Sequence, residues 1–344
     1  MPQPSRSSVS WRSQVLRGAG LLALLLAAPA CRAMPAPPAP LALVADVPLP
    51  GSASRFDYAS LDAAAHRLYL NHMGAGEVVV LDVDSRRVLA VLKGFSSCTG
   101  ILVVSARHEL YVSVAGEGRV AILDTRSLRE LARIPVGRFP DGIAFDPEDN
   151  RVFVSDERGR QVVAIDAPTR QVLARIPMGG EVGNTQYDPV SRRIYSNVQT
   201  LNQLVAIDPK TLKVVSRTDL PGAEGNHGLL IDPEQHLAFV ACEGNSVLQV
   251  VDLDRHQVVA TFPVGRDPDV LAFDPVTRRL VVASESGPAA VFREAGRSLR
   301  REGDQDVGSN AHVVAIDPGT HLLYFPLKRL GSRPGLRILR PKQP

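Results

Sequence analysis

Short apolar runs separated by turn residues recur along most of the chain. They are clearest in residues 138–180, where Val, Ile and Phe gather in short stretches between Gly, Pro, Asp and Asn. Runs of this kind between turn signals predict β-strands. The segment predicts four strands in succession, at IAFDP (143–147), RVFVSD (151–156), QVVAID (161–166) and QVLARIPMG (171–179).

This four-strand unit occurs seven times. The residue that ends its first strand recurs at spacings of 42, 42, 42, 44, 42 and 43 positions, at Asp62, Val104, Asp146, Asp188, Asp232, Asp274 and Asp317. Seven four-stranded units with this period predict an all-β fold, the seven-bladed β-propeller. The apolar runs are nearly continuous rather than alternating, which indicates blades packed on both faces by their neighbours.

The seventh unit lacks its fourth strand, because the chain ends after the third. The missing element is found at the other end, where LALVADVPLPG (41–51) resembles the fourth strand of the other units. We expect this segment to be the outer strand of blade seven and to close the ring, which protects sheet edges from aggregation. Residues 41–344 are therefore expected to form a single propeller domain.

The first residues have the features of a leader. Three Arg precede the apolar run LLALLLAAPA (21–30), which is short for a membrane span and suits a secretory signal. Residues 1–31 are expected to be a signal peptide or a lipoprotein leader. Ala28-Pro29-Ala30 fits signal cleavage, and the same residues before Cys31 resemble a lipobox whose Cys is lipidated. Residues 32–40 are expected to be a Pro-rich tether.

Both alternatives for the leader place the mature protein outside the bacterial cytoplasm, in the periplasm or anchored to the outer membrane. Membrane contact is expected only through the lipid anchor at Cys31. The chain has 39 Lys and Arg against 36 Asp and Glu, a net charge of +3, but residues 1–40 hold four Arg and no acidic residue. Residues 41–344 therefore carry 35 basic and 36 acidic groups and no Trp. This composition argues against a nucleic-acid partner.

The repeats also resemble a known family. LYVSVAGEGRVAILDTRS (110–127) and RVFVSDERGRQVVAIDAPT (151–169) are similar to the YVTN-type repeat, and AEGNHGLLIDPEQHLAFVAC (223–242) is similar to YncE-like periplasmic propellers. The resemblance covers essentially all of 41–344 and implies the propeller fold. It implies no single function: most members have no assigned role, one member type is reported to bind single-stranded DNA, and wider relatives include quinoprotein dehydrogenase chains, lyases and lactonase-like enzymes.

One position in each unit predicts where a ligand would bind. The first strand of each blade lines the central channel of a propeller, and the loops entering it and following the second strand open on one face, the channel mouth. The residue five before the strand-ending residue is expected at this mouth. Around the ring it is Asp57, Thr99, Asp141, Gly183, His227, Asp269 and His312. Blades five, six, seven and one are neighbours, so His227, Asp269, His312 and Asp57 are expected to form one arc.

Imidazole and carboxylate groups in one arc suit a divalent transition metal, and they suit general acid–base chemistry equally well. The metal-ligand candidates are His227, Asp269, His312 and Asp57, and the catalytic candidates are His227 and His312. The ligand-binding candidates are these four residues together with Asp141, Asn226 and Asn310. His72, at the end of the second strand of blade one, is a further candidate imidazole. The alternative is that Asp at a strand entry only caps a turn.

Other repeated or reactive residues are expected to be structural. An Asp closes the third strand before a polar turn, as an Asx-type hydrogen bond requires, at Asp82, Asp124, Asp166, Asp208 and Asp252. Cys98 and Cys242 belong to blades nearly opposite in the ring, so we expect two buried, unpaired thiols. Five His are expected in exposed turns at the face opposite the mouth: His66, His108, His236, His256 and His321.

Three functions are consistent with these features. The first is a monomeric, non-catalytic binding module that holds a small ligand, a metal or a protein partner at the channel mouth. The second is a metal-assisted lyase or lactonase-like enzyme, with a His as general base, carboxylates as ligands and a divalent metal as cofactor. The third is single-stranded DNA binding, as reported in YncE-like relatives.

Overall fold

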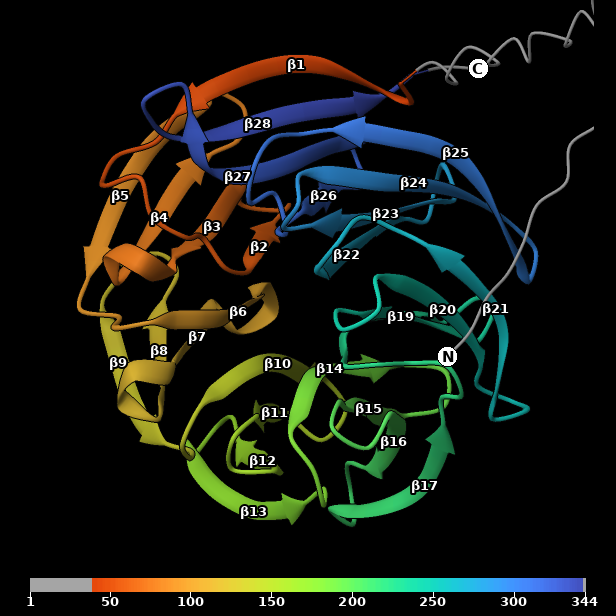
Figure 1. Cartoon of the computed structure of the whole chain (residues 1–344). Helices are drawn as coiled ribbons and strands as arrows, with labels where there is room; N and C mark the ends of the chain where they lie inside the picture. Colours follow the sequence, from red (N-terminus) through yellow and green to blue (C-terminus); the bar gives the residue numbers. More distant parts are fainter. Residues whose placement is uncertain (1–38, 343–344) are drawn as a thin grey trace, which may run out of the picture. The chain divides into compact units, whose positions relative to one another are not determined.

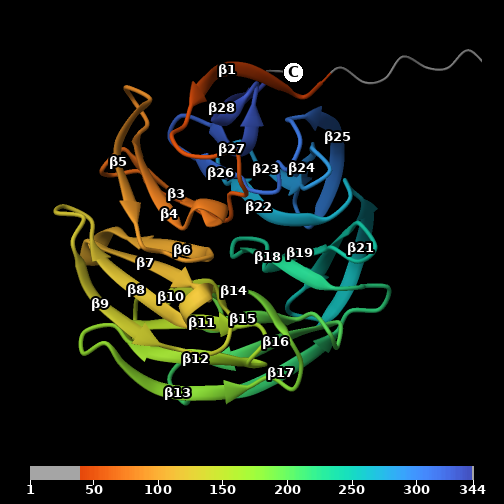
Figure 2. The same ribbon diagram turned by 60° about the vertical axis from the view of Figure 1, so that its left-hand side comes forward.

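Seven four-stranded antiparallel sheets surround a central axis in the computed structural model, which describes residues 39–342 (Figure 1). The fold is a seven-bladed β-propeller, as the repeat predicts. Figure 2 shows the same sheets standing side by side around the ring. The predicted leader, its Cys31 and most of the Pro-rich tether lie outside the described residues.

The strands of each blade follow the chain from the axis outward. Blades one to three are β2(Ala59–Asp62), β3(Arg67–His72), β4(Glu77–Asp82), β5(Arg87–Lys93); β6(Cys98–Val104), β7(Glu109–Val114), β8(Arg119–Asp124), β9(Glu130–Pro135); and β10(Pro140–Asp146), β11(Arg151–Asp156), β12(Gln161–Asp166), β13(Gln171–Pro177). Single 3₁₀ turns occur at η1(Met73–Ala75), η2(Ser105–Arg107) and η3(Ala115–Glu117).

Blades four to six continue this order. They are β14(Val182–Asp188), β15(Arg193–Val198), β16(Gln203–Asp208), β17(Lys213–Asp219); β18(Asn226–Asp232), β19(Leu237–Cys242), β20(Val247–Asp252), β21(Gln257–Pro263); and β22(Pro268–Asp274), β23(Arg279–Ser284), β24(Pro288–Ala295), β25(Ser298–Asp306). Blade seven joins the two ends of the chain, with β26(Ala315–Asp317), β27(Leu322–Leu330), β28(Arg333–Pro341) and β1(Leu41–Pro48).

The N-terminal strand closes the ring, as predicted. β1 pairs with β28 in antiparallel register from Leu41 opposite Pro341 to Pro48 opposite Gly335. The guanidinium of Arg337 donates to both carboxylate oxygens of Asp46, at 2.9 and 2.8 Å, in the bidentate geometry that fixes such a pair. Leu41, at the start of β1, and Leu49, just after its end, are buried in the clusters on the two sides of blade seven, so apolar packing stabilises the closure as well as charge.

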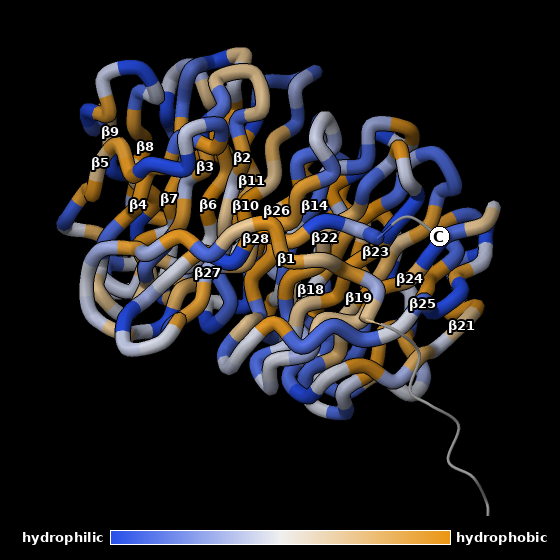
Figure 3. The backbone as a smooth tube through the Cα atoms, turned by 90° about the horizontal axis from the view of Figure 1, so that it is seen from above, coloured by the Kyte–Doolittle hydropathy of each residue, from blue (hydrophilic) through white to orange (hydrophobic). Residues whose placement is uncertain are grey.

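The hydrophobic core lies between blades. Seven clusters of buried apolar side chains occupy the seven interfaces of the ring, for example Val152, Ile165 and their neighbours between blades two and three. The second and third strands of each blade are buried on both faces, which explains their continuous apolar runs. Figure 3 shows the same division, with hydrophobic residues along the strands and hydrophilic residues at the turns.

Two sets of repeated aspartates serve the turns, and this role was predicted for the set that ends the third strands. The Asp that ends the first strand accepts hydrogen bonds from the following turn; Asp274, for example, accepts from the Val276 amide at 2.9 Å and the Thr277 hydroxyl at 2.7 Å. The Asp that ends the third strand does the same, as when Asp124 accepts from the amide and the hydroxyl of Ser127, both at 2.7 Å. These carboxylates replace the backbone partners that a tight turn leaves missing.

The five turn histidines all adopt left-handed backbone conformations, with φ between 53° and 59°. Three of them, His66, His108 and His256, are exposed, as predicted, whereas His236 and His321 are half-buried, against the prediction. His236 donates toward Asp188, at 3.1 Å, and toward Asp254, and its side chain is 20% exposed. His321 lies 2.8 Å from Asp274. The reason is that each of these two histidines lies against the preceding blade, where Asp188 or Asp274 is available as a partner.

Candidate functional site

A cavity of about 190 Å³ opens at the channel mouth. Two kinds of segment form it: the residues that enter the first strands and the loops that follow the second strands. Its lining residues are Arg55, Asp57, Tyr58, Met73, Thr99, Phe139, Asp141, Glu157, Gln199, His227, Glu243 and Asp269. Five of these carry carboxyl groups, so the cavity is acidic.

The predicted mouth position contributes most of this lining. Asp57, Asp141, His227 and Asp269 all face the cavity, together with Thr99. Asp57, Asp141 and Asp269 are 5%, 3% and 2% exposed, so their carboxyl groups have little contact with bulk water. His312 is fully buried beside the cavity, in contact range of Asp57.

Backbone irregularities place these side chains. In blades two to six the pairing of the first strand with the second shifts register across the mouth position, for example between Pro140 and Ile143 and between Pro268 and Leu271. Such β-bulges redirect a side chain at the end of a strand. Gly228 is needed for the same reason, because a Cβ there would lie 1.9 Å from the Asp269 carbonyl oxygen. The absence of a side chain allows strands β18 and β22 to approach each other.

His227 joins two carboxylates across the mouth. Its Nε2 lies 3.1 Å from Asp141 Oδ2 and its Nδ1 lies 3.2 Å from Asp269 Oδ1. Burial alone would lower the pKa of His227, but the hydrogen bonds to Asp141 and Asp269 outweigh it and raise that pKa well above the ordinary value. Both nitrogens of His227 face a carboxylate oxygen, an arrangement that favours the protonated imidazolium over the neutral ring.

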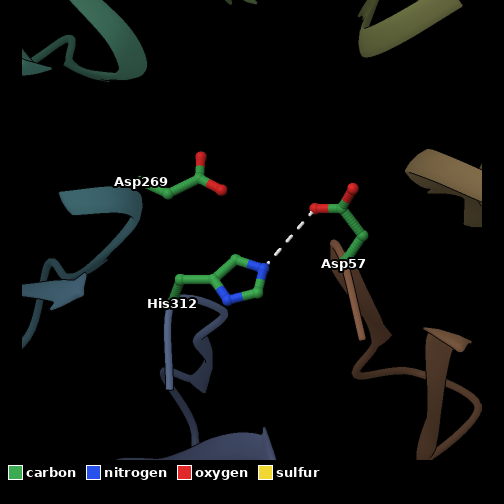
Figure 4. A group of neighbouring side chains, drawn as sticks. All are labelled: Asp57, Asp269 and His312. Atoms are coloured by element: carbon green, nitrogen blue, oxygen red, sulfur yellow. Dashed lines mark ion pairs between the residues drawn. The ribbon is translucent and has the colours of Figure 1, made fainter. Parts of the chain in front are cut away.

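A second group lies on the blade-seven side of the mouth and consists of Asp57, Asp269 and His312. One donor atom from each lies within 4.8 Å of the other two, and His312 Nε2 is 3.9 Å from Asp57 Oδ1 (Figure 4). Burial and the charges of Asp269 and Asp141 raise the pKa of Asp57 well above that of an ordinary aspartate. Burial lowers the pKa of His312, which favours its neutral imidazole.

The four-residue arc predicted from the sequence therefore divides into two unlike halves. His227 is hydrogen-bonded at both nitrogens, whereas neither nitrogen of His312 has a hydrogen-bond partner among the described residues. Asp269 belongs to both halves, since it accepts from His227 and also faces His312. Asp141 lies outside the predicted arc and yet contacts His227 from across the ring.

Charged residues from the other mouth segments were missed by the sequence interpretation. Glu157, Glu243 and Glu285 directly follow the second strands, eleven positions after the strand-ending Asp of their blades. Aligning that position around the ring would have found them. Burial raises the pKa of Glu243 to about 7, against the opposing effect of nearby His227. Arg55 forms an ion pair with Glu285 and lies 4.0 Å from Asp269.

Tyr58 forms the floor of the cavity. Its hydroxyl donates to Asn184 Oδ1 at 2.7 Å, and this bond joins blade one to blade four across the channel. Tyr58 lines both the mouth cavity and a second cavity deeper in the channel, which contains Asn184 and Val314. Tyr58 therefore lies between the mouth cavity and the deeper one.

Three predicted residues do not reach the cavity. Asn226 is fully buried and donates to Asn197 Oδ1 at 3.1 Å and to the Gln203 carbonyl at 3.0 Å, because neighbouring residues in a strand point to opposite sides. Asn310 has a left-handed backbone, φ 64°, and is not among the lining residues. His72 stacks on Phe56 at 4.1 Å and bonds to Ser54 Oγ at 2.9 Å, in a separate site.

Cys98 and Cys242 are free and buried, as predicted. Burial raises the pKa of each thiol to about 12, so neither is a nucleophile at neutral pH. Within the described residues, no helix is long and apolar enough to cross a membrane.

Comparison with known proteins supports the fold and does not indicate a family or a function. No protein-family model matches the chain, and no curated protein matches it in sequence. Among solved structures, it is similar to a chain of Kuenenia stuttgartiensis hydrazine synthase, with a TM-score of 0.72 at 15% identity over 86% of this chain and 96% of that one. It is also similar to a chain of a mitotic checkpoint complex, with a TM-score of 0.75 at 13% identity over 95% of this chain and 100% of that one. At these identities the likeness is one of fold.

Proposed function

We propose that the protein is an extracytoplasmic binding module of the YVTN-repeat, YncE-like type, which holds a small positively charged ligand at its channel mouth. One observation carries this proposal: the mouth cavity brings together Asp57, Asp141 and Asp269, all nearly buried, without the turn contacts that occupy the other repeated aspartates. Burying carboxylates is costly. His227 and Arg55 offset part of the charge of the five carboxyl groups that line the cavity, and a cationic ligand would offset the rest.

The size and charge of the cavity narrow the class of ligand. A volume of about 190 Å³ is below the range of drug-sized pockets, so the ligand is a metal ion with its waters or a small organic ammonium ion. The carboxyl groups would repel phosphate, which disfavours a nucleic-acid strand at this mouth. Shifted pKa values at Asp57, His227 and Glu243 are typical of a functional site.

Thermal unfolding of the untagged full-length protein tests this proposal. Choline, putrescine, lysine, Zn²⁺ and Mn²⁺ serve as cationic probes, with glucose and phosphate as neutral and anionic controls. We expect at least one cation to raise the melting temperature in proportion to the logarithm of its concentration, as binding to the folded state requires. The shift should disappear in the Asp141→Asn/Glu243→Gln double variant. If no cation acts on the wild type, or the variant responds equally, the proposal is wrong.

A metal-assisted enzyme is the second candidate, because His227 is held between two carboxylates. Asp269 orients the imidazole through Nδ1, and Asp141 Oδ2 lies 3.1 Å from Nε2. Transfer of the Nε2 proton to Asp141 would leave a neutral, oriented imidazole that can act as a general base. The test is hydrolysis of a panel of γ- and δ-lactones by protein supplied with Mn²⁺ or Zn²⁺. Turnover by the wild type that the His227→Gln variant lacks would favour the enzyme over the binding module.

The extracytoplasmic location is part of the proposal and depends on the leader. Cell fractionation of the wild type and a Cys31→Ser variant distinguishes its two forms. A lipoprotein is found in the membrane fraction and moves to the periplasm in the variant, whereas a freely secreted protein is periplasmic in both. Recovery of both proteins in the cytoplasm with an intact leader would contradict the location.

A further inference from the structure

We propose that Asp57, Asp269 and His312 bind one divalent transition-metal ion at the inner edge of the mouth cavity, and that His227 is not one of its ligands. This inference rests on the proposed function and assigns one ligand of the same cavity. It also revises the four-residue set that the sequence indicated, because the two histidines differ in what already occupies their nitrogens.

The three side chains converge on a space that one ion would fill. One donor atom from each lies within 4.8 Å of the other two, and His312 Nε2 is 3.9 Å from Asp57 Oδ1. Donors that bind a tetrahedral ion at about 2.1 Å lie about 3.4 Å apart. Small rotations of the two aspartates close the remaining difference. Figure 4 shows that the residues come from three separate segments and face one another.

His312 provides the independent evidence for a ligand. The side chain is 0% exposed, and neither Nδ1 nor Nε2 has a hydrogen-bond partner among the described residues. Buried polar groups are nearly always satisfied, so two unpartnered nitrogens on one buried ring require an explanation. A metal ion on Nε2 satisfies the first. Glu285 Oε1 lies 3.9 Å from Nδ1, and a shift of about 1 Å would let it accept from that nitrogen, as a carboxylate behind a metal-bound imidazole commonly does.

His227 is excluded by the same criterion. Two further groups of possible ligand atoms contain His227, one with Asp141 and Glu157 and one with Glu243 and Asp269. The two nitrogens of His227 already hydrogen-bond to Asp141 and Asp269, at 3.1 and 3.2 Å, whereas those of His312 have no such partner among the described residues. It is a positioning residue: its contact with Asp269 Oδ1 fixes that carboxylate and leaves the other oxygen for the ion. A site that used His227 would have to break one of these contacts.

Charge and donor type indicate the class of ion. The only guanidinium lining the cavity belongs to Arg55, whose nearest approach to Asp269 is 4.0 Å and which is paired with Glu285. A divalent ion would offset the carboxylates that Arg55 does not reach. Mg²⁺ and Ca²⁺ prefer sites made of oxygen donors, whereas one imidazole with two carboxylates suits first-row ions such as Zn²⁺, Mn²⁺ or Co²⁺.

Calorimetric titration of untagged, EDTA-treated full-length protein with Zn²⁺, Mn²⁺ and Co²⁺ tests the site. We expect one ion per chain for the wild type and at least a hundred-fold weaker binding in His312→Ala and in Asp57→Asn, which keeps the shape of the side chain. His227→Gln should weaken binding less than ten-fold, and His321→Ala, a histidine of the opposite face, should not change it. The visible spectrum of the Co²⁺ form should change in His312→Ala and remain in His321→Ala. Circular dichroism verifies that each variant is folded.

Three results would overturn the assignment: no stoichiometric binding of any of the three ions, unchanged affinity in folded His312→Ala and Asp57→Asn, or a loss in His227→Gln as large as that in His312→Ala. The last would place the ion beside Glu243 or Glu157 instead. If metals fail but choline, putrescine or lysine still raise the melting temperature, only the metal site is wrong. If no cation acts, the proposed function fails with it.

Discussion

The two ends of the channel-lining strands differ in a way that separates structure from function. At the end away from the mouth, six of seven blades have the same residue, Asp, and each of these carboxylates bonds to its own turn, as Asp188 and Asp274 do. At the mouth the residue changes from blade to blade, and side chains such as Asp57 and His312 meet partners from other blades or none. The residue that recurs serves the turn of its own blade. The residue that differs between blades is free to contact other blades or a ligand once the ring is assembled.

Both ends of the channel-lining strands keep their arrangement only in a closed ring. Removing β1, the strand that closes the ring, should therefore have the largest effect on stability. Deleting residues 41–49 removes β1, its bidentate Asp46–Arg337 pair and the buried Leu41 and Leu49. We expect a melting temperature lower by more than about 10 °C, because several kcal/mol of apolar burial are lost. Differential scanning calorimetry measures this. An unchanged unfolding midpoint would show that blade seven does not need its outer strand.

Replacing a repeated aspartate should be the next largest effect. Asp188 is fully buried and accepts from the Val190 amide at 3.0 Å, from the Ser191 hydroxyl at 2.6 Å and from His236 at 3.1 Å. We expect Asp188→Ala to lower the free energy of unfolding by about 2 kcal/mol, because the turn donors lose their acceptor. Urea denaturation measures the loss. A neutral result would mean that the repeated position is not structural.

Replacing a mouth aspartate should act in the opposite direction. In metal-free protein, Asp57→Asn is expected to raise the free energy of unfolding by about 1 kcal/mol, because it removes a buried carboxyl group that Asp269 and Asp141 repel. The folded-state pKa of Asp57 lies above its unfolded value of 3.8, so this group loses stability as the pH rises through that value toward the folded pKa.

The gain in Asp57→Asn should therefore grow between about pH 4 and neutrality. Paired urea denaturation of wild type and variant in EDTA at several pH values measures the difference. Asp219→Asn, at an exposed outer strand end, is the matched control and should show no such trend. Destabilisation by Asp57→Asn would indicate that the mouth residues support the fold, and the contrast between the two strand ends would be lost.

The smallest expected effect concerns whether reagents that enter the mouth cavity reach the buried cysteines. Cys98 begins β6 and Cys242 ends β19, both on the mouth side, yet burial raises each thiol pKa to about 12. In a Cys31→Ser protein at pH 8, we expect no alkylation by iodoacetamide over an hour and two modified thiols after denaturation, by mass spectrometry. Rapid labelling of the folded protein would show that the cavity extends behind the strand ends.

The sequence predicts the fold because the same pattern of apolar runs and turn residues occurs in all seven units. A buried double-faced sheet needs apolar runs and tight turns, and each copy repeats the signal. It also identifies the mouth position, since register is fixed by the repeat. Orientation was harder: Asn226 was included although it neighbours His227 and so must point the other way. The difference between His227, whose two nitrogens are hydrogen-bonded, and His312, whose nitrogens have no partner among the described residues, could not be predicted. It depends on β-bulges and on contacts between blades that are remote in sequence.

Closure by the first strand has a consequence for the order in which the protein can be made. Asp46 and Arg337 pair across 291 positions, so β1, the first strand of the ring to be synthesised, can pair only after β28, the last strand of the ring, has been made. Until then the growing chain has two unpaired sheet edges and an incomplete blade. The ring therefore cannot close before β28 is made. A chain that stops short of β28 remains an open, protease-sensitive intermediate, and only a chain that includes β28 can form the closed ring.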